Sequence, residues 1–352
     1  MKILFLIIVS SVLATIILAA CPMNYLINPC HCSDGRITCD GEYSYNLKNI
    51  FTKLNRTLRH EVDRTFEEFV LNNTDISELV DDVFGMIRFR KIRLVDALSL
   101  RRISGNAFAK NGDLVEQFVA SGESLLGEDA HSNDLFDAFN QLTNCKRIWL
   151  NRNRLRSIPT VAFGKRANSN FQLEELNFNK FSSKNGNIRS VGNFAFYYLN
   201  QLTYLYLSHQ RINYLPSNAF DFERPSNRTL YIYLGNNKLN NTSFEKGIFL
   251  NTKRPVHLEL YWNPDLTYLD EKVFAPFLDQ NKQNKISLQD NPLTCDCNSY
   301  WMVRDKEKYQ DQLSNVMCKI GPKQSFSIDL IPFDKCANNG KKRNKGKLTI
   351  VN

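Results

Sequence analysis

The chain has 352 residues, of which 43% are hydrophobic and 12% aromatic, with only 15 Gly and 11 Pro. This composition excludes collagen, low-complexity disorder and a small disulfide-dominated domain. The formal net charge is +9 at pH 7; Lys2 supplies one positive charge and residues 341–347, KKRNKGK, supply five. The remainder is near +3, so we interpret the basicity as a property of one C-terminal tail.

Residues 1–20, MKILFLIIVSSVLATIILAA, place one lysine before a long apolar run that ends in small residues. This pattern predicts a secretory signal peptide cleaved before Cys21. Two alternatives stay open: a membrane anchor, because about 20 apolar residues span a bilayer, and a bacterial lipoprotein signal that would attach lipid to Cys21. No later segment is apolar enough to span a membrane, so we expect a secreted, extracellular protein.

Eight of the nine cysteines form two groups of four, one directly after this segment and one near the C-terminus. In an exported chain such groups predict two disulfides each, and four cysteines allow three pairings. A bond across the single residue of Cys30-His31-Cys32 or Cys295-Asp296-Cys297 would be badly strained. Zinc binding is the weaker alternative, since His31 is the only histidine near either group. The eight residues are Cys21, Cys30, Cys32, Cys39, Cys295, Cys297, Cys318 and Cys336.

Five Asn-x-Ser/Thr sequences predict N-linked glycans if the chain is exported. Asn240 and Asn241 are adjacent, so we do not expect both to be modified. The predicted sites are Asn55, Asn72, Asn227 and Asn240.

An eleven-residue pattern recurs through the middle of the chain, with apolar residues at positions 1, 4, 6 and 11 and an amide at position 9. The clearest copies are Leu202–Ile212 and Cys145–Leu155. Position 1 recurs every 23 to 30 residues, at 66, 89, 115, 145, 173, 202, 229, 255 and 283. Roughly 20 residues into each unit an apolar residue precedes a phenylalanine, at Phe84, Phe108, Phe139, Phe163, Phe196, Phe220, Phe249 and Phe274. Such a period predicts a solenoid in which each unit buries its apolar faces against the next.

This pattern resembles the leucine-rich repeat family over about residues 21 to 336. The resemblance implies an α/β solenoid, a horseshoe with one parallel sheet on its concave face. Positions 4 and 6 then point inward and position 5 outward, while the position 9 amide bonds backbone groups of adjacent coils. Position 9 is Thr74, Phe181 and Gln210 in three copies, and the unit at 173 carries an insertion around 182–186. Cys145 falls on an inward position and is expected to be a buried free thiol rather than a reactive one.

The cysteine groups resemble the terminal caps of extracellular leucine-rich repeat proteins, which cover the core that an open solenoid exposes. The second group follows Asn291-Pro-Leu-Thr and precedes Trp301, which we place in the cap core. In such caps the first cysteine pairs with the third and the second with the fourth. The resemblance therefore implies Cys21–Cys32, Cys30–Cys39, Cys295–Cys318 and Cys297–Cys336. The expected organisation is a signal peptide (1–20), cap and lead-in (21–65), repeats (66–290), second cap (291–336) and basic tail (337–352).

Within this superfamily, four features resemble arthropod secreted proteins that are labelled as non-catalytic subunits of Oplophorus-luciferin 2-monooxygenase. They are the CP…PCHC start, the ITCDG segment, the apolar-Phe units and the NPLTCDC close. The resemblance implies an accessory chain that supports a separate catalytic chain.

No recognised catalytic constellation is present. His60-Glu61 begins like a zinc-protease helix but lacks the second histidine, and neither a Gly-x-Ser-x-Gly elbow nor a phosphate-binding glycine loop occurs. We expect no enzymatic activity, cofactor or metal site. The histidines are interpreted as surface or cap residues: His31, His60, His131, His209 and His257.

The repeat frame places aromatic side chains at outward positions of the fourth to eighth units. Aromatic and arginine side chains dominate binding hot spots, so this face predicts a docking surface for an extracellular protein. The alternative is that these rings only pack against their cross-strand neighbours. A glycan on Asn72 would crowd the N-terminal end and favour binding further along. The predicted residues are Arg147, Trp149, Tyr204, Tyr206, Tyr231, Tyr233, His257, Tyr261 and Trp262.

Three functions compete: a secreted binding or scaffold protein that uses its concave face, an accessory subunit that stabilises a secreted enzyme, and an enzyme with an unrecognised site. The basic tail suggests a sulfated glycan as a further partner. Nucleic acid is not expected outside the cell.

Overall fold

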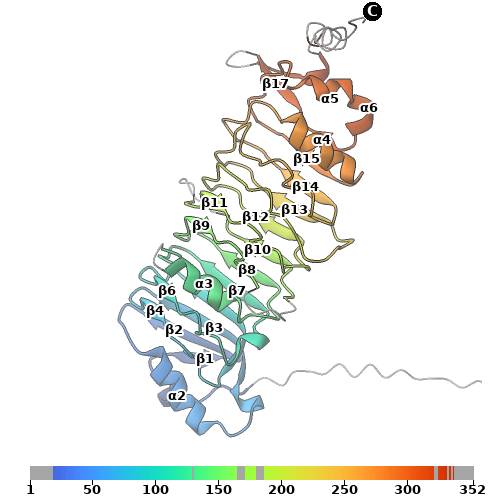
Figure 1. Cartoon of the computed structure of the whole chain (residues 1–352). Coiled ribbons are helices and arrows are strands. Elements are labelled where there is room, and N and C mark those ends of the chain that lie inside the picture. Colours follow the sequence, from blue (N-terminus) through green and yellow to red (C-terminus); the bar gives the residue numbers. More distant parts are fainter. Residues whose placement is uncertain are drawn as a thin grey trace, which may run out of the picture.

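The computed structural model describes residues 19–128, 131–164, 171–179, 186–320, 324–330, 333 and 336. The predicted signal segment up to residue 18, the basic tail and most of the insertion in the unit at 173 lie outside these residues. The described chain forms an elongated stack of coils with a cap at each end (Figure 1). Within those residues, no helix has the length and apolar character needed to cross a membrane.

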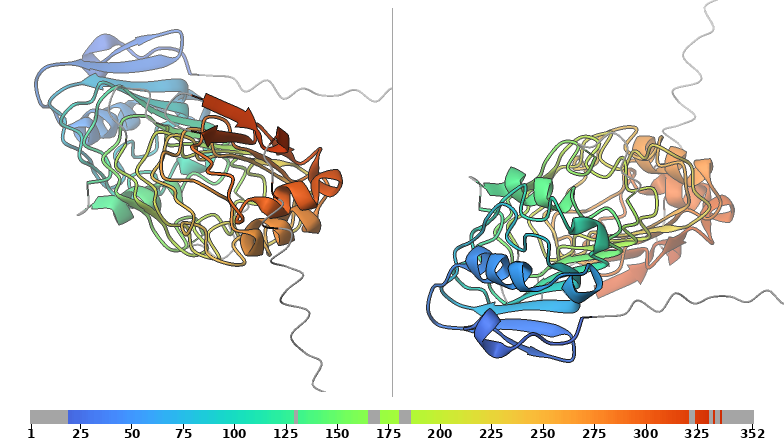
Figure 2. Two further views of the ribbon diagram at one scale, coloured as in Figure 1. Left: turned by 90° about the horizontal axis from the view of Figure 1, so that it is seen from above. Right: turned by 90° about the horizontal axis from the view of Figure 1, so that it is seen from below.

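Twelve strands form one sheet along the stack, and seen along its length the coils overlie one another (Figure 2). Only β1 and β2 pair antiparallel; the other neighbours in this sheet are parallel. In order, the strands are β1 (His31–Ser33), β2 (Arg36–Gly41), β3 (Thr65–Asn73), β5 (Arg88–Val95), β7 (Gln117–Ser121), β8 (Arg147–Leu150), β10 (Glu175–Asn177), β12 (Tyr204–Tyr206), β13 (Leu230–Tyr233), β14 (Val256–Glu259), β15 (Lys285–Ser287) and β16 (Leu313–Ser314).

Shorter elements complete the coils and caps. Two pairs of short parallel strands lie on one flank of the stack (Figure 1), and an antiparallel pair belongs to the second cap. These strands are β4 (Glu78–Leu79), β6 (Arg102–Ile103), β9 (Ser157–Ile158), β11 (Ser190–Val191), β17 (Met317–Ile320) and β18 (Gln324–Ser327). The helices are α1 (Asn24–Ile27), α2 (Leu47–Thr57), α3 (Ser132–Phe139), α4 (Glu271–Gln280), α5 (Tyr300–Arg304) and α6 (Lys306–Tyr309), with 3₁₀ turns η1 (Val62–Arg64), η2 (Gly112–Leu114) and η4 (Ile328–Leu330).

The strand register follows the repeat frame from β3 to β15. Phe66 pairs with Phe89, both at position 1 of their units. Leu205 and Leu207 are fully buried, whereas Tyr206 between them is only half-buried. The predicted alternation is confirmed, and it arises because successive strand side chains point to opposite faces. The chain is a leucine-rich repeat solenoid with an open, mostly parallel sheet.

The recurring phenylalanines form a column through the core behind the sheet. All eight are at most 2% exposed. Phe196 stacks on Phe220 with ring centroids 6.2 Å apart, and Phe220 stacks on Phe249 at 5.8 Å. Burying one such ring contributes about 1.5–3 kcal/mol relative to leaving it exposed. The second sequence marker therefore places aromatic rings of successive coils in contact, most clearly from Phe196 to Phe274.

The position 9 amides hold neighbouring coils together. Asn263 is fully buried; its Oδ1 accepts from the backbone N–H of Asn237 at 3.1 Å, and its Nδ2 donates to the Leu260 carbonyl at 2.8 Å. Asn291 repeats the pattern by accepting from the Asn263 N–H at 2.8 Å. Each amide thus satisfies backbone groups in its own coil and the preceding one, as expected for buried polar groups.

Two departures from the Asn pattern have structural explanations. Gln210 keeps the role, since its Nε2 donates to the Phe178 carbonyl at 2.6 Å. In the first unit, Thr74 does not hold this position; the neighbouring Asn73 accepts from the N–H groups of Asp75 and Ile76, each at 2.8 Å. The amide has moved by one residue there. Phe181 lies outside the described residues.

All eight cap cysteines are in disulfides, with the pairing that the resemblance implies: Cys21–Cys32, Cys30–Cys39, Cys295–Cys318 and Cys297–Cys336. The zinc interpretation is therefore wrong. Lipid attachment at Cys21 is also incompatible with this structure, because it needs a free sulfur. Cys145 is a buried free thiol, and burial raises its pKa to about 12, which keeps it unreactive.

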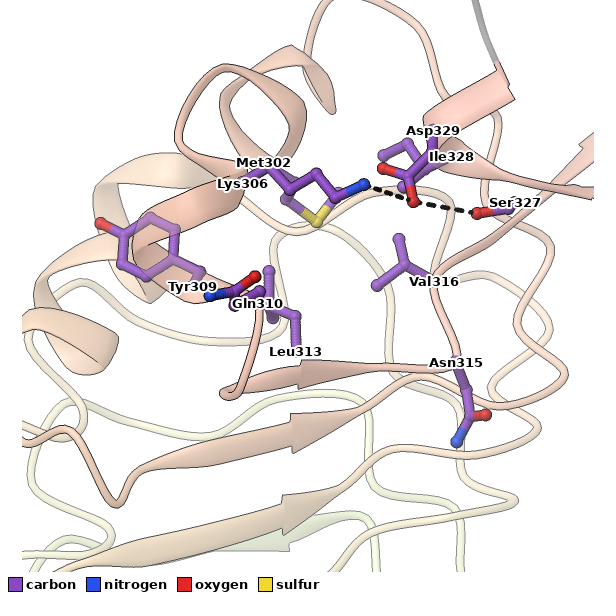
Figure 3. A pocket seen from close by; sticks show the side chains of 10 residues that line it. All are labelled: Met302, Lys306, Tyr309, Gln310, Leu313, Asn315, Val316, Ser327, Ile328 and Asp329. Carbon is purple, nitrogen blue, oxygen red and sulfur yellow. Dashed lines mark hydrogen bonds and ion pairs between the residues drawn. The ribbon is translucent and has the colours of Figure 1, made fainter.

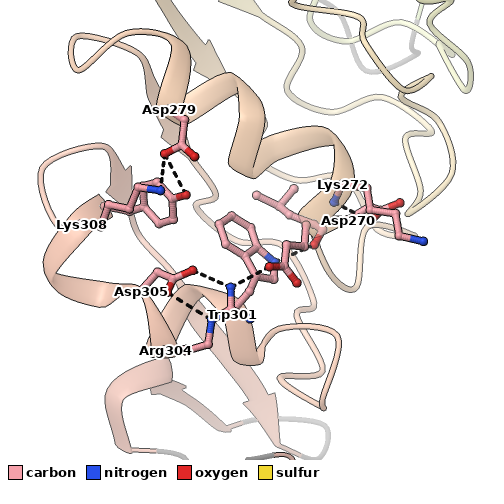
Figure 4. A network of polar contacts seen from close by, with 10 residues as sticks. Asp270, Lys272, Asp279, Trp301, Arg304, Asp305 and Lys308 are labelled. Carbon is pink, nitrogen blue, oxygen red and sulfur yellow. Dashed lines mark hydrogen bonds and ion pairs between the residues drawn. The ribbon is translucent and has the colours of Figure 1, made fainter. Parts of the chain in front are cut away.

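Each cap extends the sheet by a strand as well as covering its end. Strand β2 pairs with β3, and β16 pairs with β15. In the second cap, the Trp301 indole N–H donates to the Leu269 carbonyl at 3.1 Å, and the indole packs edge-on to Tyr309 (Figure 4). Tyr309 donates in turn to Asp279 of α4 at 3.1 Å. Trp301 therefore lies in the cap core as predicted, and polar contacts fix the cap to the last repeat.

Candidate binding surface on the concave face

Three adjacent strands place aromatic rings on the outer side of the sheet. Strands β12, β13 and β14 align Tyr204 with Tyr231 and His257, and Tyr206 with Tyr233. These are positions 3 and 5 of the repeat, which point away from the core because the intervening leucines and isoleucine are buried. We call these five residues the aromatic strip.

The tyrosines of the strip pack against one another across the strands. Tyr206 and Tyr233 stack with centroids 4.6 Å apart and planes 7° from parallel, and Tyr204 and Tyr231 stack at 5.2 Å and 20°. The cross-strand packing alternative is therefore present in the structure. It covers much of the ring faces and leaves edges accessible; Tyr204 is 38% exposed.

Partial burial shifts the pKa values of two tyrosines and of the histidine in the aromatic strip. Burial raises the pKa of Tyr233 to about 12, and it also raises the pKa of Tyr206. Both hydroxyls therefore remain hydrogen-bond donors at neutral pH. Burial, followed by the charge of Lys285, lowers the pKa of His257. The strip offers polar, uncharged groups over an aromatic base.

Tyr261 and Trp262 extend this surface beyond the end of β14. Trp262 is 55% exposed, and its ring centroid lies 6.5 Å from that of Tyr261. The Tyr261 ring lies directly over Gly235, where an added Cβ would be 2.2 Å from the ring. The close approach needs a glycine at this position, a requirement that the repeat pattern alone does not reveal.

Trp149 and Arg147 share the sheet face but are separated from the aromatic strip by β10. Arg147 lies 3.8 Å from Glu175 of that strand, and burial raises the pKa of the Glu175 carboxyl against the opposing effect of Arg147. Asn177, at an outward position of β10, is only 9% exposed. The predicted concave-face residues thus lie in two groups: Arg147 and Trp149 on one side of β10, and the aromatic strip with Tyr261 and Trp262 on the other.

The N-terminal strands present charge in place of tyrosine. Glu68 on β3 is only 3% exposed at its side chain and pairs with Arg36 at 2.5 Å and Arg93 at 2.9 Å. Beside it, Glu67 pairs with Lys91 at 2.7 Å. We call these five residues the charged strip. Its side chains are all engaged in ion pairs within the sheet.

The histidines are scattered and make local contacts. His31 lies 4.0 Å from Asp40, and His209 Nδ1 lies 2.9 Å from the Asn236 amide. Across the described ranges, no group of three His, Cys, Asp or Glu side chains has a geometry that holds a metal ion.

The predicted glycosylation sites differ in accessibility. Asn72 at the end of β3 and Asn227 are exposed, while Asn55 and Asn240 are half-buried. The Asn241 carboxamide is occupied, since it accepts from the Thr267 N–H at 2.8 Å and donates to its hydroxyl at 2.8 Å. Asn240 is bound through its Oδ1, which accepts from the N–H and hydroxyl of Thr242 at 2.9 Å each, whereas the Nδ2 that would carry a glycan is engaged in Asn241. Their modification stays a prediction.

A separate cleft of about 230 Å³ lies in the second cap (Figure 3). Met302, Leu313 and Val316 supply its apolar lining. At its rim, Lys306 Nζ lies 3.0 Å from Asp329 Oδ2. The charges facing this cleft are therefore already paired, and it is remote from the aromatic strip.

Comparison with known proteins finds one relative by sequence and similar solved structures. The chain is 26% identical over 337 residues, covering 89% of this chain and 87% of the other, to the Oplophorus-luciferin 2-monooxygenase non-catalytic subunit of Oplophorus gracilirostris. Among solved structures it is similar to human 5T4 (TM-score 0.47, 14% identity, 89% of this chain and 98% of that one) and to the Drosophila Toll–Spatzle complex (TM-score 0.40, 16% identity, 74% and 36%). No protein-family model matches the sequence.

Proposed function

We propose that this chain is a secreted, non-enzymatic leucine-rich repeat protein that captures another protein through the aromatic strip. The observation that carries the proposal is the set of four tyrosines on β12 and β13, stacked in pairs on the open face of the sheet. Rigid aromatic side chains supply contact area at low entropy cost. Their hydroxyls can donate hydrogen bonds to the carbonyl and carboxylate acceptors of a protein surface.

Secretion is part of the same proposal. Four disulfides at the two ends of the solenoid favour an oxidising compartment. The N-terminal apolar segment and the exposed Asn72 and Asn227 sequences agree with export. Intact mass measurement of the protein from culture medium tests cleavage before Cys21 and glycan attachment together.

A photo-crosslinking amino acid at Tyr204 tests where the partner docks. Tyr204 is 38% exposed in the aromatic strip, and Leu250, 58% exposed outside the sheet, is the matched control. We expect a partner of discrete mass to be captured from secreted fluid at position 204 and not at 250. Equal capture at both positions would contradict the proposal.

Replacing Tyr206 and Tyr233 together by Ala tests the energetics. We expect partner affinity to fall by roughly 30-fold or more, since a hot-spot aromatic contributes about 2 kcal/mol when truncated. Tyr25→Ala, at a site 66% exposed in the first cap, is the control. Circular dichroism checks that both proteins stay folded; unchanged affinity in the folded double variant would rule out this face.

An accessory role beside a secreted enzyme is the second candidate, and the name of the crustacean relative favours it. It predicts that a catalytic chain co-purifies at a fixed ratio and loses activity faster when this chain is removed. Assay of the purified chain alone addresses catalysis: intrinsic activity would overturn the non-enzymatic proposal.

A further inference from the structure

Positive charge is concentrated in the centre of the chain as well as in the tail. Residues 138–220 contain eleven Lys and Arg but only two acidic residues, Glu174 and Glu175. This segment alone has a net charge of +9, as large as that of the whole chain. The near-balanced charge outside the tail therefore conceals a basic centre that is offset by acidic regions elsewhere.

Folding gathers four arginines of this segment on the flank that carries β9 and β11. Ser157 pairs with Ser190 between these strands, so Arg156 and Arg189, one residue earlier in each, lie in register on adjacent coils. Neighbouring strands lie about 4.8 Å apart. We call Arg154, Arg156, Arg189 and Arg211 the basic flank.

Arg154 and Arg211 occupy the same position of their repeat units. Each is position 10, and the backbone N–H of each donates to the preceding coil, to Leu126 at 2.7 Å and to Ile188 at 2.9 Å respectively. All four arginines of the basic flank are exposed. They form a row that crosses three successive units and lies on a different side of the coils from the concave sheet.

Arg156 of the basic flank has an interaction partner, whereas the other three arginines carry charge that no described residue pairs. Arg154, Arg189 and Arg211 form no ion pair with any residue in the described part of the chain, in contrast to Arg36 and Arg93, which share Glu68. Repulsion among unpaired like charges destabilises a folded chain unless a counter-charge binds.

The aliphatic side chains next in sequence to these arginines point inward, whereas Tyr214, which pairs with Ser190, is 46% exposed and donates to Glu245. Leu155, Ile188 and Ile212 are completely buried. Apart from Tyr214, this flank has no apolar centre of the kind that protein interfaces bury. A row of guanidinium groups instead fits a flexible polyanion, whose oxyanion groups each accept charge-assisted hydrogen bonds.

We propose that the basic flank binds a linear sulfated polysaccharide. Its charges are spread over several coils, as a chain-like ligand requires. The inference rests on the proposed secretion, which the disulfide-bonded caps favour and which would expose the protein to such polymers and not to nucleic acids. This surface is independent of the proposed protein docking on the aromatic strip. It also replaces the basic tail as the principal polyanion site.

The test compares heparin binding by three forms of the full protein. The flank variant carries Arg154→Gln, Arg189→Gln and Arg211→Gln. A matched variant removes the same charge from exposed positions elsewhere, through Arg59→Gln, Lys246→Gln and Lys282→Gln. We expect the flank variant to lose heparin affinity by on the order of 30-fold at physiological salt, with a shallower salt dependence. The matched variant is expected to change by less than about threefold.

Two further measurements distinguish the basic flank from the tail, and a sulfated ligand from any polyanion. Deletion of residues 337–352 should preserve most of the affinity, and polyglutamate of equal charge should compete poorly with heparin. Equal losses in the flank and matched variants, complete loss on tail deletion, or equal competition by polyglutamate would each overturn the proposal. The Tyr206→Ala, Tyr233→Ala protein should bind heparin normally, so failure of this proposal is distinguishable from failure of the protein-docking proposal.

Discussion

The two ends of the concave sheet use the same outward positions for different chemistry. On β3 and β5, position 3 and position 5 residues such as Glu68 and Arg93 pair their charges within the sheet. On β12 and β13, the same positions hold tyrosines stacked in pairs. In the charged strip the side chains pair with one another. In the aromatic strip the tyrosine rings stack on one another, and their hydroxyls are left to bind another molecule.

The comparison shows that exposure alone does not identify a binding surface. Arg36 and Arg93 are about half exposed, yet both are committed to the buried carboxylate of Glu68. Tyr206 and Tyr233 are less accessible, but their hydroxyls form no hydrogen bond with the residues that the structure describes. What matters is which group remains available after contacts within the sheet are made.

The largest effect is expected from Gly235→Ala at the aromatic end. The new Cβ would lie 2.2 Å from the Tyr261 ring, so the ring must move. Overpacking of this kind costs about 2 kcal/mol, and chemical denaturation measures it. Combining the change with Tyr261→Ala should recover most of the loss because the clash is removed; no recovery would show that the strain lies elsewhere.

Glu68→Ala at the charged end is expected to have the next largest effect. It leaves Arg36 and Arg93 side by side without their shared carboxylate. Because both arginines are half exposed, water compensates part of the loss, and we expect destabilisation of about 1.5 kcal/mol. Glu61→Ala, which removes a mostly exposed partner of Arg88, should cost less than about 0.5 kcal/mol in the same measurement.

The smallest effect is expected in the alkaline titration of the tyrosines. Tyr233 has a pKa of about 12 in the folded protein, against about 10 when unfolded. The unfolded chain thus releases this proton first, so stability falls as pH rises from 10 toward 12. Tyrosinate absorbance should show late-titrating groups, and Tyr233→Phe should remove one of them. Tyr45, also near 12, must remain after that change; an unaltered titration curve would contradict the assignment.

Sequence periodicity predicted the coil register because the same local rule repeats nine times. Inward Leu205 and Leu207 with outward Tyr206 follow from strand alternation, and burial of Cys145 follows from its position in the same frame. The position 9 rule failed at Thr74, where Asn73 performs the bonding. In this first unit, which adjoins the cap, the bonding amide stands one residue earlier than the pattern predicts.

The sequence by itself determined the architecture, because hydrophobic spacing and cap cysteines are local and repeated features. The tertiary structure decided which outward groups are already bound and which surfaces form. Glu175 and Asn177 divide the predicted concave residues, Gly235 makes room for Tyr261, and arginines from separate units meet on one flank. These outcomes depend on distances between coils, which a linear pattern does not contain.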